Sequence, residues 1–294
     1  MSYRITAATD FSAHARHAAE RAALIASDQA AVLDLIHVVH LGPLERLREL
    51  LLAENEDLTA QVTQAAQARM DGLADRLLAR RGVPASTRIR VGAVLAELFA
   101  AFEEVRPSLV VCGDRGERAL RQTLLGSTAE KLLSRAPCPV LVVKQPARDR
   151  YRTVLVSVDF SAASLRAIHH AIEIAPAADL VLLHVFEVPF EGQLRYASVD
   201  ENRIQHYRDI ARADAIERLQ ALARQAGLEP QAVRMLVVNG DPFLRIAEME
   251  QEHDSDLLVL GKRAKGAVEA ALLGSVSRQV VAQSQGDVLV SVEQ

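Results

Sequence analysis

The stretch from Gly113 to Thr128 decides the fold, and it reads GDRGERALRQTLLGST. Apolar runs flank it, LVVC before it and PVLVV after it, and residues 129–133 continue it as a helix-like run. Such a pattern is typical of a strand, a glycine-rich turn and a helix start. In a parallel sheet this order forms a crevice at the carboxyl edge, where nucleotides bind. We interpret the stretch as a phosphate-binding loop.

Three glycines set the spacing of this loop. Two residues separate Gly113 from Gly116, and nine separate Gly116 from Gly126, which Ser127 and Thr128 follow. Because glycine has no Cβ, its backbone N–H can approach an anion closely, and amides at a helix start also meet the positive end of the macrodipole. An α/β protein without a ligand also needs glycine at such turns and Ser or Thr as a cap. A single copy of the motif leaves both interpretations open.

Four landmarks of the first half recur in the second half, each between 147 and 149 residues later. The pairs are Asp10-Phe11-Ser12 with Asp159-Phe160-Ser161, His37-Val38 with His184-Val185, Gly92 with Gly240, and Gly126-Ser127 with Gly274-Ser275. One period kept at four points indicates duplication of a domain. We predict one domain over residues 1–145 and a second over residues 151–294, joined by the linker QPARDRY at 145–151.

Each half alternates apolar runs with helical patterns. In the first half we expect strands at 3–9, 32–39, 87–91, 109–112 and 140–143, with helices between them and an amphipathic helix, or a pair, over 43–81. This order predicts an α/β fold of two tandem doubly wound domains, each a five-stranded parallel sheet with helices on both faces. The repeated landmarks would then converge on the carboxyl edge, where we predict a ligand cleft.

The composition excludes several classes of partner. Of the 294 residues 50% are apolar, 24% charged and 4% aromatic, and the formal net charge is −4. A broad basic surface and stacking aromatic rings are both lacking, so we expect no nucleic-acid partner. No apolar run reaches the roughly 18 residues that span a bilayer, and we find no signal peptide. We therefore expect a cytoplasmic protein with no membrane partner.

Motifs for catalysis and metal binding are missing from the sequence. It contains neither Gly-x-x-x-x-Gly-Lys-Ser/Thr nor Gly-x-Ser-x-Gly. His37 recurs as His184, so we expect a ring hydrogen bond within the sheet layer rather than a metal ligand. Cys112 and Cys138 are expected to be buried thiols rather than a redox pair, which fits a reducing compartment.

Together these features resemble the universal stress protein family, and the resemblance covers nearly the whole chain. The family signature of Gly, two residues, Gly, nine residues and Gly-Ser/Thr is complete in the first half, and the string LLGS occurs at 124–127 and at 272–275. The resemblance implies an adenine-nucleotide α-hydrolase-like fold that binds ATP in many members, with slow hydrolysis or none. It also implies that the two domains pair within one chain, and that two chains can associate as a homodimer.

The resemblance also implies the residues of two nucleotide sites, with no catalytic and no metal-binding residues. In the first site it places Val38 near the adenine, Gly113 and Gly116 along the ribose and phosphates, and the remaining residues at the strand end and the phosphate tail. The first set is Ala8, Thr9, Asp10, Val38, Gly113, Gly116, Gly126, Ser127 and Thr128. The second set is Ser157, Val158, Asp159, Val185, Gly261, Ala264, Gly274, Ser275 and Val276.

The second set departs from the signature, because Ala264 stands where the middle glycine belongs. A methyl group there strains a left-handed backbone and crowds a phosphate, so we expect unequal sites with the first closer to the pattern. Ala8 also replaces a proline that is frequent in the family. Five charged residues lie in or near the loops, and each could pair with phosphate, but for any one of them we expect a solvated side chain instead. They are Arg115, Arg118, Lys262, Arg263 and Lys265.

Asp10 and Asp159 are the carboxylates that the repeat places at the cleft. Each can accept a hydrogen bond from a ribose hydroxyl, hold Mg²⁺ through a nucleotide, or serve as a helix cap with no ligand. One carboxylate without a positioned partner is poor equipment for phosphoryl transfer. The leading hypothesis is a non-enzymatic, ATP-binding stress regulator whose occupancy is read by an unidentified protein partner. The alternative is a scaffold or carrier of small apolar ligands with degenerate nucleotide sites.

Overall fold

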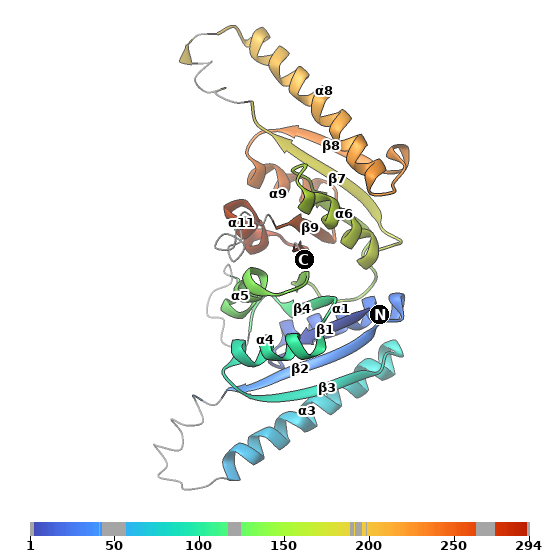
Figure 1. Ribbon diagram of the computed structural model, residues 1–294, viewed down its shortest axis with the longest axis vertical. Coiled ribbons are helices and arrows are strands. Elements are labelled where there is room, and N and C mark those ends of the chain that lie inside the picture. The colour runs from blue at the N-terminus through green and yellow to red at the C-terminus, as the bar shows by residue number, and fades with distance from the viewer. Residues whose placement is uncertain are drawn as a thin grey trace. The chain divides into compact units, whose positions relative to one another are not determined.

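The computed structural model describes residues 3–40, 42, 57–116, 125–188, 191, 196–197, 199–262 and 274–292. The chain divides between Arg150 and Tyr151 into two compact units (Figure 1). Each unit holds five strands that pair in parallel. The predicted fold class is confirmed, and each unit is described by itself.

The first unit alternates strands and helices along the chain. Its described elements are β1 (Arg4–Ala8), α1 (Ala13–Gln29), β2 (Val32–His40), α3 (Asp57–Arg81), β3 (Ala85–Gly92), α4 (Val94–Val105), β4 (Leu109–Gly113), α5 (Ser127–Arg135) and β5 (Val140–Val143). The strand order is β3-β2-β1-β4-β5. The predicted helix or pair of helices over 43–81 is described only from residue 57, and residues 43–56 lie outside the described ranges.

The second unit follows the same order. Its described elements are β6 (Thr153–Ser157), α6 (Ala162–Ile174), β7 (Asp179–Phe186), α8 (Glu201–Gln225), the 3₁₀ turn η1 (Pro230–Ala232), β8 (Arg234–Asn239), α9 (Pro242–Glu252), β9 (Leu257–Gly261), α11 (Ser275–Gln283) and β10 (Asp287–Ser291). The strand order is β8-β7-β6-β9-β10. It repeats the first unit strand for strand, as expected of a duplicated domain.

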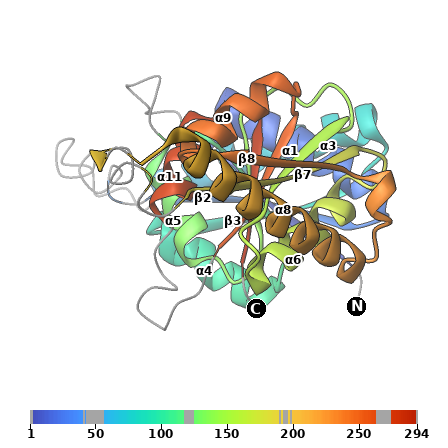
Figure 2. The same ribbon diagram turned by 90° about the horizontal axis from the view of Figure 1, so that it is seen from above.

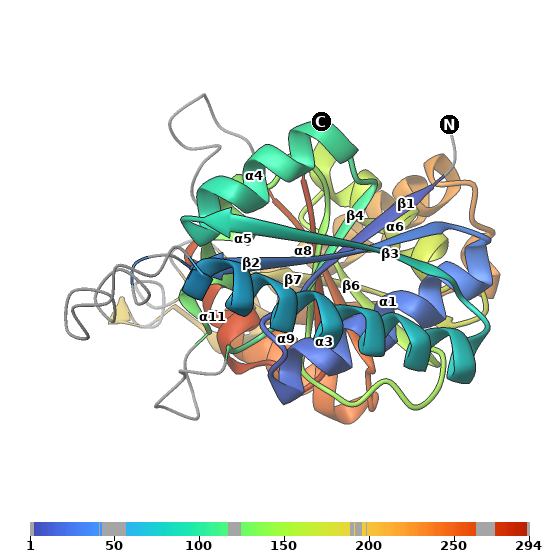
Figure 3. The ribbon, with the colours of Figure 1, turned by 90° about the horizontal axis from the view of Figure 1, so that it is seen from below.

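Helices cover both faces of each sheet. Figure 3 shows α1 and α3 on one side of β2 and β3, with α4 on the other. Figure 2 shows α6 and α9 on opposite sides of β7. Crossovers between parallel strands are right-handed as a rule, so the helices change face when the chain reverses its direction across the sheet after its third strand. The strand order therefore switches between β1 and β4 and between β6 and β9, and crevices form at such points.

The apolar sequences of the central strands match their complete burial. Leu109, Val110 and Val111 of β4 have no exposed surface, and all four residues of β5 are equally buried. A strand covered by helices on both faces needs a continuous apolar run rather than an alternating one. The long helices contribute from one face: Leu73 and Leu77 of α3 are 3% and 1% exposed.

Two equivalent glycines let a helix pack tightly on the sheet. A Cβ on Gly113 would lie 2.8 Å from the backbone carbonyl carbon of His14 in α1. On Gly261 it would lie 2.9 Å from the same atom of Ala163 in α6. Real Cβ atoms do not approach backbone this closely, so only glycine fits. The first glycine of each loop therefore has a packing role that needs no ligand.

The predicted linker holds to the first unit. Arg21 in α1 donates a hydrogen bond of 2.7 Å from Nη1 to the carbonyl of Asp149. Arg81 at the end of α3 donates one of 2.7 Å to the carbonyl of Ala147. Residues 147–149 are thus fixed to the two helices on one face of the first sheet.

We expect Gly113→Ala to destabilise the first unit by about 1–3 kcal/mol, because its methyl group forces α1 away from β4. Gly72→Ala is the matched control: a Cβ there meets only the flexible end of Arg76, at 3.6 Å. It should stabilise α3 by about 0.5–1 kcal/mol. Urea unfolding followed by circular dichroism measures both. Equal stabilities of the two variants would contradict the packing role.

Candidate functional site

The carboxyl ends of β1 and β4 lie side by side at the switch point of the first sheet. The predicted residues Ala8, Thr9 and Asp10 leave the sheet from β1, and Gly113 ends β4. In the second unit Ser157, Val158 and Asp159 leave from β6, while Gly261 ends β9. The structure thus brings together the strand-end residues of each predicted set.

A hydrogen-bonded turn follows β1. The amide of Thr9 donates to the carbonyl of Ile36 at 2.9 Å. The Nδ1 atom of His37 lies 2.8 Å from the carbonyl oxygen of Thr9, so this ring nitrogen carries the hydrogen and donates it. Both polar backbone atoms of Thr9 are therefore held by β2. This is the ring hydrogen bond predicted from the recurrence of His37.

The second unit has the same turn. The amide of Val158 donates to the carbonyl of Leu183 at 2.8 Å. His184 Nδ1 donates to the carbonyl of Val158, also at 2.8 Å. The residue that follows the aspartate, Phe11 or Phe160, has a positive φ of 66° or 60°. A non-glycine residue pays about 1 kcal/mol or more for that conformation, so neighbouring contacts must hold it.

The aspartates bind the turn rather than cap the helix, which corrects the cap interpretation. Asp10 Oδ1 accepts a hydrogen bond of 2.9 Å from the amide of Ser12, and it is Ser12 that caps α1 by accepting from Ala15. Asp159 Oδ1 accepts from the amide of Ser161 at 2.9 Å and from the hydroxyl of Ser164 at 2.6 Å.

A stack of three side chains supports each turn. The rings of Phe11 and His37 are 4.3 Å apart at their centroids, and Arg69 Cζ from α3 lies 4.2 Å from the Phe11 centroid. The second unit repeats this, with 4.2 Å between Phe160 and His184 and 4.1 Å between Arg218 Cζ of α8 and Phe160. Cation–π attraction stabilises such contacts by about 0.5–1 kcal/mol at an exposed site. The contacts of the stack thus help to hold Phe11 and Phe160 in their strained backbone conformation.

Burial lowers the pKa of His37, the hydrogen bond to Thr9 partly opposes this, and the charge of Arg69 lowers the pKa further. The pKa of His184 is lowered by the same causes, burial first, with Val158 and Arg218 in the corresponding roles. Both rings are therefore neutral at pH 7 and donate through Nδ1.

Sequence reasoning missed the two arginines. Arg69 and Arg218 recur at the period of the other landmarks. They lie in long helices rich in charged residues, where one arginine looks like any other. Checking charged positions against the repeat period would have found them.

The glycine loop of the first unit packs against the strand ends. The amide of Gly126 donates to the carbonyl of Asp114 at 2.8 Å. A Cβ on Gly116 would lie 2.8 Å from Asp10 Oδ2, so this glycine admits the carboxylate to the loop. The N-cap residue of α5 is Gly126, which has no side chain to cap the amides of Ser127 and Thr128.

The second loop is described in part. Gly274 precedes α11, whose first residues are Ser275 and Val276, and no described side chain caps its amides. A Cβ on Gly274 would meet no described atom within 4 Å. The predicted departure at Ala264 lies outside the described residues, as do Arg118, Arg263 and Lys265.

One loop position carries opposite charges in the two units. Asp114 directly follows β4 and is 6% exposed, while Lys262 directly follows β9 and is 7% exposed. Asp114 Oδ1 lies 2.7 Å from His14 Nδ1, and its Oδ2 lies 3.2 Å from Arg115 Nε. Burial lowers the pKa of Lys262. The prediction of solvated loop charges was wrong at Lys262.

Val38 and Val185, the predicted adenine contacts, each follow the donating histidine on β2 and β7. Val38 is 8% exposed. Beyond Val185 the carbonyl of Phe186 accepts hydrogen bonds from the amide of Gly240 at 3.0 Å and from the Asn239 side chain at 3.2 Å.

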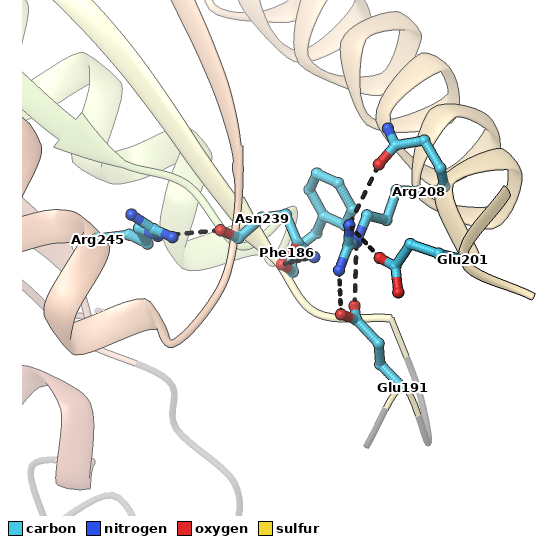
Figure 4. Close-up of polar contacts among 7 residues, drawn as sticks. Phe186, Glu191, Glu201, Arg208, Asn239 and Arg245 are labelled. Atoms are coloured by element: carbon cyan, nitrogen blue, oxygen red, sulfur yellow. Dashed lines mark hydrogen bonds and ion pairs between the residues drawn. The ribbon is translucent and has the colours of Figure 1, made fainter. Parts of the chain in front are cut away.

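Figure 4 shows the polar contacts beyond this end of β7. Arg245 donates to the carbonyl of Asn239 at 3.0 Å. Arg208 of α8 pairs with Glu191 and, at 3.4 Å, with Glu201. The ion pair between Arg208 and Glu191 thus joins α8 to the segment after β7, while the pair with Glu201 lies within α8.

Both cysteines are buried, as predicted, and burial raises the pKa of Cys112 and of Cys138 to about 12. In the part of the chain that the structure describes, no group of three or more His, Cys, Asp or Glu side chains is placed to bind a metal ion. No helix within the described ranges is long and apolar enough to cross a bilayer.

Comparison with known proteins gives one family. The model of the universal stress protein family matches residues 1–144 and again residues 150–291. A universal stress protein of Mycolicibacterium smegmatis is 31% identical over 98% of this chain and 96% of its own length. The crystal structure of a universal stress protein from Archaeoglobus fulgidus covers 99% of this chain and 96% of its own, with a TM-score of 0.68 and 22% identity, which supports the fold.

Another universal stress protein was crystallised in complex with cAMP. It is 26% identical over 49% of this chain and 98% of its own, with a TM-score of 0.32. At that TM-score its ligand does not locate a site here.

We expect Arg69→Gln to raise the pKa of His37 toward 6.5 and to leave His184 unchanged, because only the first stack loses its positive charge. Arg218→Gln should act on His184 alone. Titration of the ring resonances by NMR measures both, and each unit is the control for the other. A shift of both histidines, or of neither, would count against the stack.

The lowered pKa of His37 determines how the stability of the first unit changes with pH. The folded pKa of His37 lies below the unfolded value of about 6.5, so its stabilising effect is complete above that pH and decreases as pH falls toward the folded pKa. Between pH 7.5 and 5.5, Arg69→Gln should therefore lose less unfolding free energy than the parent protein. Urea unfolding at both pH values checks this.

Proposed function

Because the chain belongs to the universal stress protein family and carries two of its domains, we propose that it is a nucleotide-responsive stress regulator that binds ATP. The main support is the start of α5, where Gly126 offers no side-chain cap to the first amides and donates its own amide to the carbonyl of Asp114. Helix starts of this kind bind phosphate through N–H groups and the macrodipole. The start of α11 offers the same arrangement.

The proposed pose follows the sheet edge. The adenine lies near Val38 or Val185, the ribose near Asp10 or Asp159, and the phosphates at Gly126 to Thr128 or Gly274 to Val276. The stacks preorganise the strand-end turn, since Thr9 and Val158 are held before any ligand arrives. A preorganised site loses less binding free energy to the ordering of protein groups when the ligand binds. Mg²⁺, if it accompanies ATP, would be carried by the phosphates.

The proposal includes little or no hydrolysis. The relatives carry the name universal stress protein and no name of an enzymatic activity. The Asp10 carboxylate accepts the amide of Ser12, and Asp159 accepts from Ser161 and Ser164. Carboxylates engaged in this way fix the turn and are poorly placed to activate water. Occupancy, rather than turnover, would then be the signal.

Cytoplasmic location and a downstream protein partner belong to the same proposal. So does pairing of the two domains within one chain, with further homodimerisation. Light scattering of the purified protein with and without ATP tests whether assembly depends on the nucleotide.

We expect Ser127→Asp to weaken ATP binding in the first unit at least about tenfold, since the added carboxylate meets the phosphates. The variant should fold, because an acidic residue in the first helical turn is stabilising. Ser127→Ala is the matched control, with only a small loss. Isothermal titration calorimetry with millimolar ATP measures these effects, and the double variant Ser127→Asp, Ser275→Asp should not bind.

The parent protein also decides between the hypotheses. Mass spectrometry of ligands released from it should show an adenine nucleotide. If none is released, and ATP produces neither heat nor a thermal shift, the nucleotide proposal is wrong and the scaffold hypothesis replaces it.

A further inference from the structure

The residue after the fourth strand of each unit marks a difference between the two crevices. Asp114 and Lys262 follow Gly113 and Gly261 at the switch points. Their amides make equivalent hydrogen bonds, from Asp114 to the carbonyl of Val143 at 3.1 Å and from Lys262 to that of Ser291 at 2.8 Å. Both residues are more than nine-tenths buried. The backbone is therefore placed alike at the two positions, and they differ in the charge of the side chain.

In the first unit the crevice lies between carboxylates. Asp10 follows β1 with its Oδ2 close to Gly116, and Asp114 follows β4. The carbonyl of Asp114 accepts the amide of Gly126, the residue before α5, so this aspartate contacts the start of that helix. His14 and Arg115 already contact its two oxygens. Arg115 offsets part of this negative charge, and a phosphate brought here still lies near the buried Asp114 carboxylate in a medium of low dielectric.

In the second unit an aspartate follows β6 and a lysine follows β9 at the switch point. Asp159 accepts hydrogen bonds from Ser161 and Ser164, and Lys262 takes the position of Asp114. Ala163 stands against Gly261 where the first unit has His14 against Gly113. A buried ammonium group attracts an anion more strongly than a solvated one. The second unit therefore favours a ligand that carries more phosphate charge.

We propose that the two units select nucleotides by phosphate charge, the second unit binding polyphosphates with the help of Lys262 and the first unit preferring one phosphate or none because of Asp114. This rests on the proposed nucleotide function. It reverses the ranking predicted from the glycine signature, in which the first site was the better ATP site. Residues 114 and 262 carry opposite charges at equivalent backbone positions, and this difference is what the proposal uses.

Photo-crosslinking of the full chain with 8-azido-ATP and 8-azido-AMP tests the proposal, with labelled peptides assigned to each unit by mass spectrometry. The second unit should show the higher ratio of ATP to AMP labelling. Lys262→Asp should lower ATP labelling of the second unit by about 10- to 100-fold and AMP labelling much less. Asp114→Lys should raise ATP labelling of the first unit by a similar factor.

Two controls separate charge from folding. Lys262→Arg keeps the positive charge and should keep the ATP preference of the second unit. Arg212→Asp changes the net charge as much as Lys262→Asp but lies exposed on α8, so labelling should stay as in the parent. Circular dichroism verifies that each variant is folded.

The outcomes are distinct. If neither unit is labelled by either nucleotide, the proposed function fails. If both units are labelled with equal ATP to AMP ratios, and exchange of the charges changes nothing, nucleotide binding stands and the selection by phosphate charge is wrong.

Discussion

The hydrogen bond from a half-buried histidine to the carbonyl just after the first strand is the contact on which each site depends. It measures 2.8 Å in both units, from His37 to Thr9 and from His184 to Val158. Without this hydrogen bond, the conformation of the turn after the first strand would be less tightly fixed. With it, the next two residues place an aspartate at the switch point and a phenylalanine in a left-handed conformation. The helices α3 and α8 then stabilise that conformation through an arginine.

Much of the fold followed from the sequence because it depends on local patterns. Continuous apolar runs such as 140–143 mark strands covered on both faces, and β5 has those bounds. The repeat added long-range information, since landmarks kept at one period had to share a structural reason. The helix start at Ser127 was also predicted correctly, because glycine and hydroxyl residues before an apolar run mark the end of a turn and the start of a helix.

The site was predicted less completely, and the reasons are physical. Which of Asp10 and Ser12 caps α1 depends on backbone angles that composition does not give, and Ser12 does so. Burial of Lys262 depends on elements distant in sequence. The Arg69 stack joins residues 58 positions apart through a helix face that no apolar periodicity marks. Contacts between charged and aromatic side chains leave no pattern in a single sequence except through duplication.

Duplication also gave each unit freedom to change. The backbone of the two crevices has stayed alike, down to the strand-end hydrogen bonds, while the charge after the fourth strand has reversed. The strong constraint lies in the turn and in the two glycines that admit a helix, since a methyl group fits at neither. The side chains of residues 114 and 262 are under no such steric constraint, and there the units differ.

The buried thiols determine what kind of stress the protein can sense directly. With a pKa of about 12 for Cys112 and for Cys138, only about one thiol in 100,000 is ionised at pH 7. Peroxides and disulfides react with the thiolate, and access to both sulfur atoms is closed. The chain has no other cysteine. Neither cysteine is therefore placed to report an oxidant directly through thiol oxidation.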